Sequence, residues 1–290
     1  MYRLKTLLST ILVIIFQLTS ANLYGQVSLE AKYDTPYGDN KAVGKYAAVN
    51  GIQMYYELYG EGEPLLLIHG NGSNIAGMGH QIEYFKQKYK VIVADSRGHG
   101  KSGMGADSLT YIQIAADWAA LTDQLAIDSL YVLGWSDGGI VGLLLGIHHP
   151  KKVKKLAAMG ANLRPDTSAV YAWAVQWVKE SRAMAEDMIA KKDATQDWKL
   201  LKQQLALLGD QPTISVADLR RISAPVLVLA GDKDVIREEH SVEIYQHIPN
   251  AHLCIFPGET HFIPATDPVL FNATVQKFFA SPFKRVDSRW

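Results

Sequence analysis

Three residues that can act together in nucleophilic catalysis occur along the chain in the order serine, acid, base. Ser136 stands at the centre of Gly-Trp-Ser-Asp-Gly (134–138), Asp234 follows an apolar run, and His261 follows another. A serine hydroxyl is a poor nucleophile at neutral pH, so it needs a histidine to take its proton and a carboxylate to fix the histidine tautomer. These residue types predict a Ser-His-Asp hydrolytic triad.

The acid of this triad has two candidates in the stretch Gly-Asp-Lys-Asp at 231–234. We prefer Asp234, because Asp232 comes directly after Gly231 at the strand exit and has the character of a solvated turn residue. A histidine taken alone is more often structural than catalytic. His261 is the better candidate because it follows the last predicted strand.

A second set of groups predicts where the negative charge of the reaction would be held. His-Gly-Asn-Gly-Ser (69–73) follows the apolar run 65–68, and its two glycines let backbone amides turn toward a ligand. The amide of Asn71, or alternatively that of Gly72, pairs with the amide of Asp137 as an oxyanion hole. The other interpretation of 69–73 is a tight strand-to-helix turn without chemistry.

The serine requires a sharp turn between a strand and a helix. Residues 130–133 are apolar without interruption, as expected of a buried parallel strand, and a second apolar run covers 140–147. Glycines two before and two after Ser136 allow the close approach that a nucleophile elbow needs. The hydroxyl then lies at the amino end of a helix, whose dipole favours a developing negative charge.

The other elements follow the same pattern of short apolar runs separated by helical stretches. This alternation predicts an α/β fold with a mostly parallel sheet covered on both faces, entered through a hairpin at Asn50-Gly51. Ligands bind at the carboxyl ends of the strands in such sheets, where the three residues would meet. The expected strands are 45–49, 52–59, 65–68, 91–94, 130–133, 156–159, 226–230 and 253–256, and the expected helices are 81–89, 110–125, 137–148, 239–248 and 268–279.

One segment interrupts this rhythm and predicts a small helical cap over 163–214, inserted into a core of 45–162 and 215–282. Helix starts are expected at Asp193 with Gln196 and at Ser215 with Asp218. The substrate pocket is predicted to be lined by aromatic and polar residues, although the aromatic residues of the cap have packing against the core as an alternative. These pocket candidates are Trp135, Asp137, Asn162, Trp173 and Trp177.

The amino terminus has the layout of a secretory signal peptide over residues 1–25, followed by an arm over 26–44. Arg3 and Lys5 precede an apolar stretch at 7–16, which is short for a membrane span of about 20 residues. The alternative is an uncleaved anchor. We therefore expect an exported protein, periplasmic or extracellular, without membrane insertion once the signal is removed.

Composition excludes several other classes of protein. The 290 residues carry no net charge and have a pI near 7.1, so nothing favours nucleic acid as a partner. Cys254 is the sole cysteine, which leaves no internal disulfide. His148 and His149 are adjacent and do not face one another on a helix, so no metal site is expected, and hydrolysis by a triad requires no cofactor.

The motifs resemble those of the α/β-hydrolase superfamily over roughly residues 46–279. Besides the segments above, Asp-Ser-Arg-Gly-His-Gly-Lys-Ser (95–102) is similar to a family motif, and the resemblance implies that Asp95 and Arg97 shape a loop beside the elbow. Residues 134–140 and 159–162 are similar to the biphenyl hydrolase-like, valacyclovir-hydrolase branch. That branch implies a role for Asp137 in binding a substrate α-amino group.

Together these observations predict a serine hydrolase of small carboxylic esters, with aminoacyl esters as a sub-class and a small-molecule ester as its partner. Hydrolysis of lactones, amides or carbon–carbon bonds by the same triad is an alternative. A ligand-binding receptor with a residual triad is an alternative from a different class.

Overall fold

The computed structural model describes residues 33–105 and 108–284. The predicted signal peptide, residues 1–25, lies outside the described residues, as does the first part of the predicted arm. Within the described part of the chain, none of the helices combines the length and the apolar character needed to cross a membrane.

Eight strands form one sheet in the order β1-β2-β4-β3-β5-β6-β7-β8, which confirms the predicted mostly parallel sheet. The hairpin β1–β2 and the β2–β4 pair are antiparallel, and every pair from β4 to β8 is parallel. The strands are β1 (Lys45–Val49), β2 (Ile52–Tyr59), β3 (Glu63–Ile68), β4 (Tyr89–Ala94), β5 (Leu130–Trp135), β6 (Val153–Met159), β7 (Val226–Lys233) and β8 (Ala251–Thr260).

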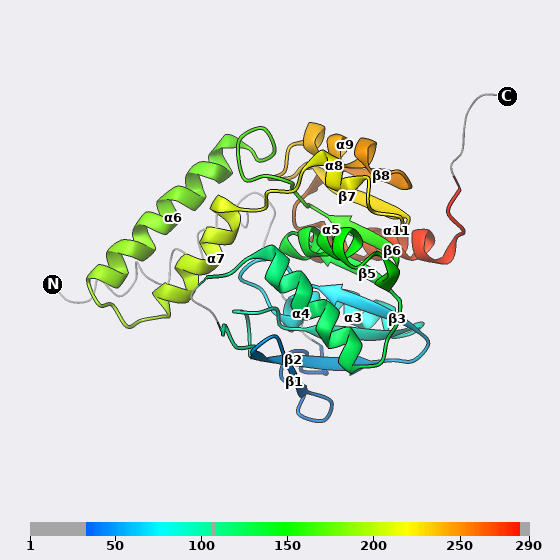
Figure 1. Ribbon diagram of the computed structural model, residues 1–290, viewed down its shortest axis with the longest axis horizontal. Helices are drawn as coiled ribbons and strands as arrows, with labels where there is room; N and C mark the ends of the chain where they lie inside the picture. Colours follow the sequence, from blue (N-terminus) through cyan, green and yellow to red (C-terminus); the bar gives the residue numbers. More distant parts are fainter. Residues whose placement is uncertain (1–32, 106–107, 285–290) are drawn as a thin grey trace.

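Helices cover both faces of this sheet (Figure 1). All five expected helices are present, and the helix after Ser136 has the predicted bounds, but the helix expected over 81–89 ends at Phe85 and Tyr89 already belongs to β4. The helices are α3 (Gly79–Phe85), α4 (Tyr111–Gln124), α5 (Asp137–His148), α6 (Ala172–Ala190), α7 (Trp198–Asp210), α8 (Val216–Leu219), α9 (Glu238–His247), α10 (Ile263–Thr266) and α11 (Pro268–Ala280), with 3₁₀ turns η1 (Ile75–Met78) and η2 (Pro150–Lys152).

Alternate residues along each strand enter two separate hydrophobic cores. Leu66 and Ile68 of β3 pack in the core that includes residues of α4, α5 and α9, whereas Leu65 and Leu67 pack with residues of α3 and α11. A strand buried on both faces must be apolar throughout. This explains why the parallel strands were visible in the sequence as uninterrupted apolar runs.

Helices α6 and α7 lie between β6 and β7 in the chain and pack against each other beside the sheet, at the left of Figure 1. The expected helix start at Asp193 with Gln196 is wrong, because Asp197 is the N-cap of α7 and accepts a hydrogen bond from the Leu200 amide at 3.0 Å. The Asp193 carboxylate instead binds Thr195 and the indole of Trp198. The capping box of Ser215 and Asp218 is present at the start of α8.

Candidate active site

Ser136 occupies the single residue between β5 and α5, with φ of 58° and ψ of −120°. Such a positive φ is uncommon for a residue with a side chain and marks a backbone held in place by its surroundings. A side-chain carbon at Gly134 would lie 2.0 Å from the Gly138 carbonyl oxygen, and one at Gly138 would lie 2.1 Å from that of Ile68. Both glycines are therefore required for this turn.

His261 joins Ser136 to Asp234 through its two ring nitrogens. Its Nε2 lies 2.9 Å from Ser136 Oγ, and its Nδ1 lies 2.6 Å from Asp234 Oδ1. Asp234 and His261 are 3% and 7% exposed, so water does not compete for the bond between them. The line of hydrogen bonds runs from carboxylate to imidazole to hydroxyl, the arrangement that activates a serine.

The two neighbouring acids of the segment 231–234 have different surroundings. The Asp234 carboxylate also accepts a hydrogen bond from the Ile236 amide at 3.0 Å, which fixes it toward His261. Asp232 is only half-buried and accepts from the Gly258 amide at 2.8 Å. Asp232 therefore holds the turn within β8 and does not contact the histidine.

The pKa of His261 is raised above its ordinary value. Burial acts to lower this pKa, but the charge and hydrogen bond of Asp234 outweigh it, and the Asp137 carboxylate adds to the same effect. Space for the ring depends on Gly160, where a side-chain carbon would lie 2.6 Å from His261 Cε1. Trp135 holds the histidine backbone by donating from Nε1 to the His261 carbonyl at 2.7 Å.

The loop after β3 passes directly beside the serine. A side-chain carbon at Gly70 would lie 3.1 Å from Ser136 Cβ and 3.7 Å from Oγ. In the described part of the chain, the next amide N–H, that of Asn71, has no hydrogen-bond acceptor, and the N–H of Asp137 belongs to the first residue of α5, where helical N–H groups lack partners. These are the two amides predicted to form the oxyanion hole.

Asp137 is buried, and both of its carboxylate oxygens are engaged. Oδ1 accepts from the Tyr111 hydroxyl at 2.8 Å, and Oδ2 accepts from Asn71 Nδ2 at 2.8 Å. Burial raises the pKa of Asp137 to about 6, although these two hydrogen bonds act in the opposite direction. The carboxylate therefore ties the elbow to the loop after β3 and to α4. Tyr111 was not anticipated from the sequence, since nothing in its neighbourhood marks a tyrosine 26 residues before its partner.

The remaining pocket candidates are more dispersed. Asn162 is 9% exposed and donates from Nδ2 to the Arg164 carbonyl at 2.8 Å. Trp173 is 56% exposed on α6, and Trp177 is half-buried on the same helix. A substrate-lining role for these three residues stays a prediction.

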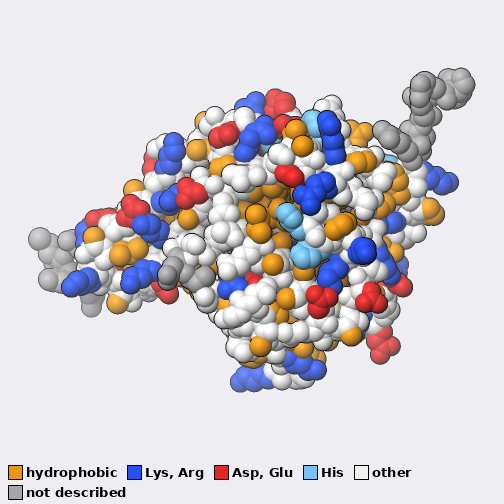
Figure 2. Space-filling model, viewed as in Figure 1, with side chains coloured by type: hydrophobic (Ala, Val, Ile, Leu, Met, Phe, Trp, Pro, Cys, Tyr) orange, Lys and Arg blue, Asp and Glu red, His pale blue; other side chains and the backbone are white. Residues whose placement is uncertain are grey.

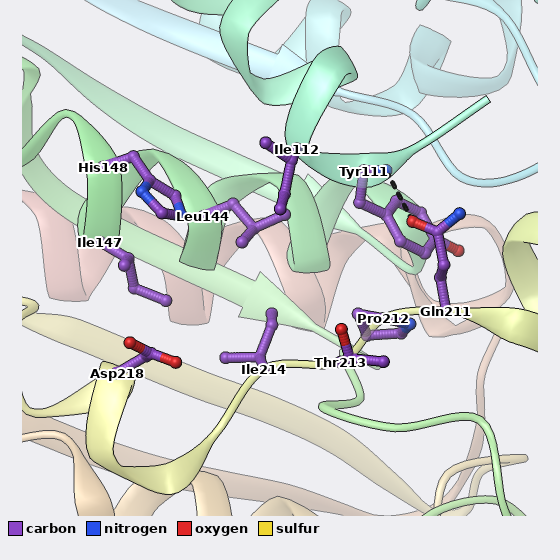
Figure 3. Close-up of a pocket in the computed structure, with 10 residues that line it drawn as sticks. All are labelled: Tyr111, Ile112, Leu144, Ile147, His148, Gln211, Pro212, Thr213, Ile214 and Asp218. Carbon is purple, nitrogen blue, oxygen red and sulfur yellow. Dashed lines mark hydrogen bonds between the residues drawn. The ribbon is translucent and has the colours of Figure 1, made fainter. Parts of the chain in front are cut away.

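A separate cavity of about 170 Å³ lies next to Tyr111, between α4, α5 and the segment 211–214 (Figure 3). Gln211 closes one end, where its Oε1 accepts from the Tyr111 amide at 3.3 Å. Figure 2 shows hydrophobic side chains gathered on this face of the molecule, with histidine side chains beside them. His148 lines the cavity, and no cluster of three or more His, Cys, Asp or Glu side chains suited to a metal ion occurs among the described residues.

Comparison with known proteins identifies the family to which this fold belongs. The model of the family described as alpha/beta hydrolase fold matches residues 63–209. The human serine hydrolase BPHL is 29% identical over 250 residues, covering 80% of this chain and 84% of that protein. 3-Oxoadipate enol-lactonase 2 of Acinetobacter baylyi is 28% identical over 249 residues, covering 78% and 92%.

Solved structures show the same fold. The enol-lactonase from Burkholderia xenovorans superimposes with a TM-score of 0.69 at 21% identity, covering 82% of this chain and all of that chain. The family match spans half of the chain and includes the elbow, so the chain is a hydrolase that belongs to the alpha/beta hydrolase fold family.

Proposed function

We propose that this protein is a serine hydrolase that cleaves small carboxylic esters. The observation that carries the proposal is the line of hydrogen bonds from Asp234 through His261 to Ser136, with distances of 2.6 and 2.9 Å. The raised pKa of His261 supports it, since a more basic imidazole is a better acceptor for the serine proton.

The reaction would proceed in two halves. Ser136 Oγ attacks the ester carbonyl carbon while His261 Nε2 takes its proton, and the amides of Asn71 and Asp137 bind the oxyanion. His261 then gives the proton to the alcohol oxygen. The bond between this oxygen and the carbonyl carbon breaks, and the acyl group stays on Ser136. Water then gives a proton to His261 Nε2 and attacks the acyl carbonyl carbon, the bond to Ser136 Oγ breaks, the carboxylic acid is released, and His261 returns the proton to the serine.

The direct test is turnover of p-nitrophenyl acetate by Ser136→Ala. We expect nearly all turnover to be lost while the variant keeps its folded circular dichroism spectrum, and a fluorophosphonate to label the wild type but not the variant. Ser168→Ala, which removes an exposed hydroxyl in the segment before α6, is the control and should behave as the wild type. Turnover that survives in Ser136→Ala would overturn the assignment.

Lactones are a second candidate substrate class. Two proteins similar to this chain, one by sequence and one by fold, are enol-lactonases by name. A lactone is an internal ester, so the same attack by Ser136 opens its ring. The shape of the pocket therefore decides between lactones and linear esters. Matched rates on linear esters, lactones and anilides of one acyl group would establish the preference.

We propose aminoacyl esters as a sub-class on the basis of Asp137. Its carboxylate accepts one hydrogen bond at each oxygen, and a carboxylate has further acceptor capacity that an ammonium group can use. Asp137→Asn should reduce the preference for aminoacyl esters over their deaminated analogues. An unchanged preference would show that Asp137 serves the protein scaffold alone.

We also propose that the protein is exported, on the basis of the basic and apolar order of residues 1–25. Expression of the full chain in a Gram-negative host, followed by mass spectrometry of the periplasmic fraction, tests this. A mature amino terminus near residue 25 is the expected result. An intact chain in the cytosol would refute it.

A further inference from the structure

His69 is the first residue after β3, and its imidazole ring has a defined tautomer. The residue is 2% exposed, with Nδ1 2.7 Å from the Gly70 carbonyl oxygen and Nε2 2.9 Å from the Ser96 amide nitrogen. Because an amide N–H can only donate, Nε2 must accept, and the ring proton therefore lies on Nδ1 and is donated to Gly70. Burial lowers the pKa of His69 to about 4, so the ring is neutral at ordinary pH.

The Gly70 carbonyl belongs to the same peptide unit as the Asn71 N–H. In a trans peptide the C=O and N–H bonds are coplanar and point in opposite directions. A donor that holds the carbonyl of Gly70 on one side therefore turns the N–H of Asn71 to the other. Gly70 itself lies against Ser136, so the direction of this N–H matters for the reaction.

The other contacts of this loop hold the orientation of the Gly70–Asn71 peptide plane only weakly. The Asn71 side chain is fixed by Asp137 and by the Gln204 carbonyl of α7, at 2.8 and 3.0 Å. Gly70 and Gly72 flank Asn71 and place few restrictions on backbone rotation. The Ser73 amide also donates to the Gly70 carbonyl, but at the longer distance of 3.3 Å.

We propose that His69 is a positioning residue, which orients the Gly70–Asn71 peptide so that the Asn71 N–H faces the oxyanion formed at Ser136. The inference rests on the proposed ester hydrolysis and adds to it a residue that does not contact the substrate. It acts through one hydrogen bond to a backbone carbonyl.

Two substitutions of His69 each keep one of the two hydrogen bonds of the ring and remove the other, so their effects can be compared. The side-chain amide of asparagine extends as far as Nδ1, so His69→Asn keeps a donor for the Gly70 carbonyl and loses the acceptor for Ser96. The longer glutamine extends as far as Nε2, so His69→Gln keeps the acceptor for Ser96 and loses the donor for Gly70. Both remove a buried ring of the same size.

With p-nitrophenyl acetate, we expect His69→Gln to lower kcat by about 10- to 100-fold, somewhat less than removal of an oxyanion donor, with KM within about threefold of the wild type. His69→Asn should keep kcat within about threefold, although both variants lose thermal stability. His99→Asn is the matched control, because His99 is also buried, donates from Nδ1 to the Arg97 carbonyl and lies 5.2 Å from the His69 ring. Its kcat should be that of the wild type.

Equal kcat losses in His69→Gln and His69→Asn, or an effect confined to KM, would overturn the positioning role. If Ser136→Ala keeps its turnover, the proposed function itself fails and this inference falls with it, so the two failures are distinguishable. Should either His69 variant not fold, ¹⁵N imidazole NMR of the wild type decides, with His69 assigned through bonds from its own backbone. A proton on Nδ1 supports the proposal, and a proton on Nε2 overturns it.

Discussion

Asn71 Nδ2 lies 2.8 Å from Asp137 Oδ2, so one hydrogen bond joins the loop after β3 to the first residue of α5. The backbone amides of the same two residues are the proposed oxyanion donors. Their side chains thus fix the separation of two N–H groups that must act together. Donors held in place before the reaction stabilise a developing charge without reorganising, which is the main source of such catalysis.

Asp234→Asn should lower kcat on p-nitrophenyl acetate by on the order of 10⁴-fold, because the amide no longer fixes the His261 tautomer that accepts the serine proton. Asp232→Asn is the matched control, since Asp232 binds the Gly258 amide and not the histidine. Steady-state kinetics of both variants checks the prediction. A larger loss of kcat in Asp232→Asn than in Asp234→Asn would show that Asp234 is not the acid of the triad.

The rate should depend on pH through His261. Only the neutral ring accepts a proton, so kcat/KM for an uncharged ester should rise with pH along a limb whose apparent pKa is above 6.5. The Asp137 carboxylate raises this pKa, so Asp137→Asn should move the limb to lower pH. A limb that stays in place or moves to higher pH in this variant would contradict the electrostatic argument.

Tyr111→Phe should reduce the free energy of unfolding by about 1–3 kcal/mol at pH 8, since it leaves a buried carboxylate oxygen of Asp137 without its hydroxyl donor. With the pKa of Asp137 at about 6, the carboxyl is largely protonated at pH 5, and the loss should be smaller there. Urea unfolding at both pH values measures it. Tyr46→Phe, at a 56% exposed side chain, should change stability little.

The loop after β4 contains one half of a buried ion pair. Arg97 Nε and Nη2 bind the two oxygens of Asp117 at 2.7 and 2.8 Å, and both side chains are almost fully buried. Asp117→Asn should lower the free energy of unfolding by about 3–5 kcal/mol, because it leaves an unpaired buried guanidinium. Asp187→Asn breaks an exposed pair with Lys191 and should have no measurable effect on the urea midpoint.

The sheet could be predicted from the sequence because strands buried on both faces must be apolar throughout. The bounds of α5 were equally clear, since the elbow gives that helix a sharp start. The start of α7 was misplaced, because Asp193 and Asp197 are both suitable caps, and Asp193 instead binds Thr195 and the Trp198 indole. The order of apolar and polar residues therefore predicted the buried strands better than it predicted the helix ends of the cap.

The residues that hold the site in place were harder to identify than those proposed for the chemistry. Asp234 was preferred over Asp232 because Asp232 was expected in a turn just after the strand, but this reason is wrong, since β7 continues to Lys233 and includes Asp232. Tyr111 gave no such signal, and His69 follows the run 65–68 but gave no sign of its partner, because each residue acts on a group that only the folded chain brings to it. Hydrogen bonds between side chains and groups far away in the sequence depend on the direction of each side chain, which the hydrophobic pattern of a sequence does not show.

The neighbouring positions of β6 and β7 have a consequence for how this enzyme can diversify. Leu156 pairs with Val226 in parallel, so the chain leaves the sheet at the carboxyl end of β6 and re-enters it at the amino end of the adjacent strand β7, and the long excursion that carries α6 and α7 has to cross back over only one strand length. The entropy of closing such a loop rises slowly, by about 0.6 kcal/mol for each doubling of length. Because the Gln204 carbonyl of α7 also holds the Asn71 side chain, exchange of this excursion would change the surroundings of the proposed oxyanion hole, whereas the contacts among Ser136, Asp234 and His261 come from other parts of the chain.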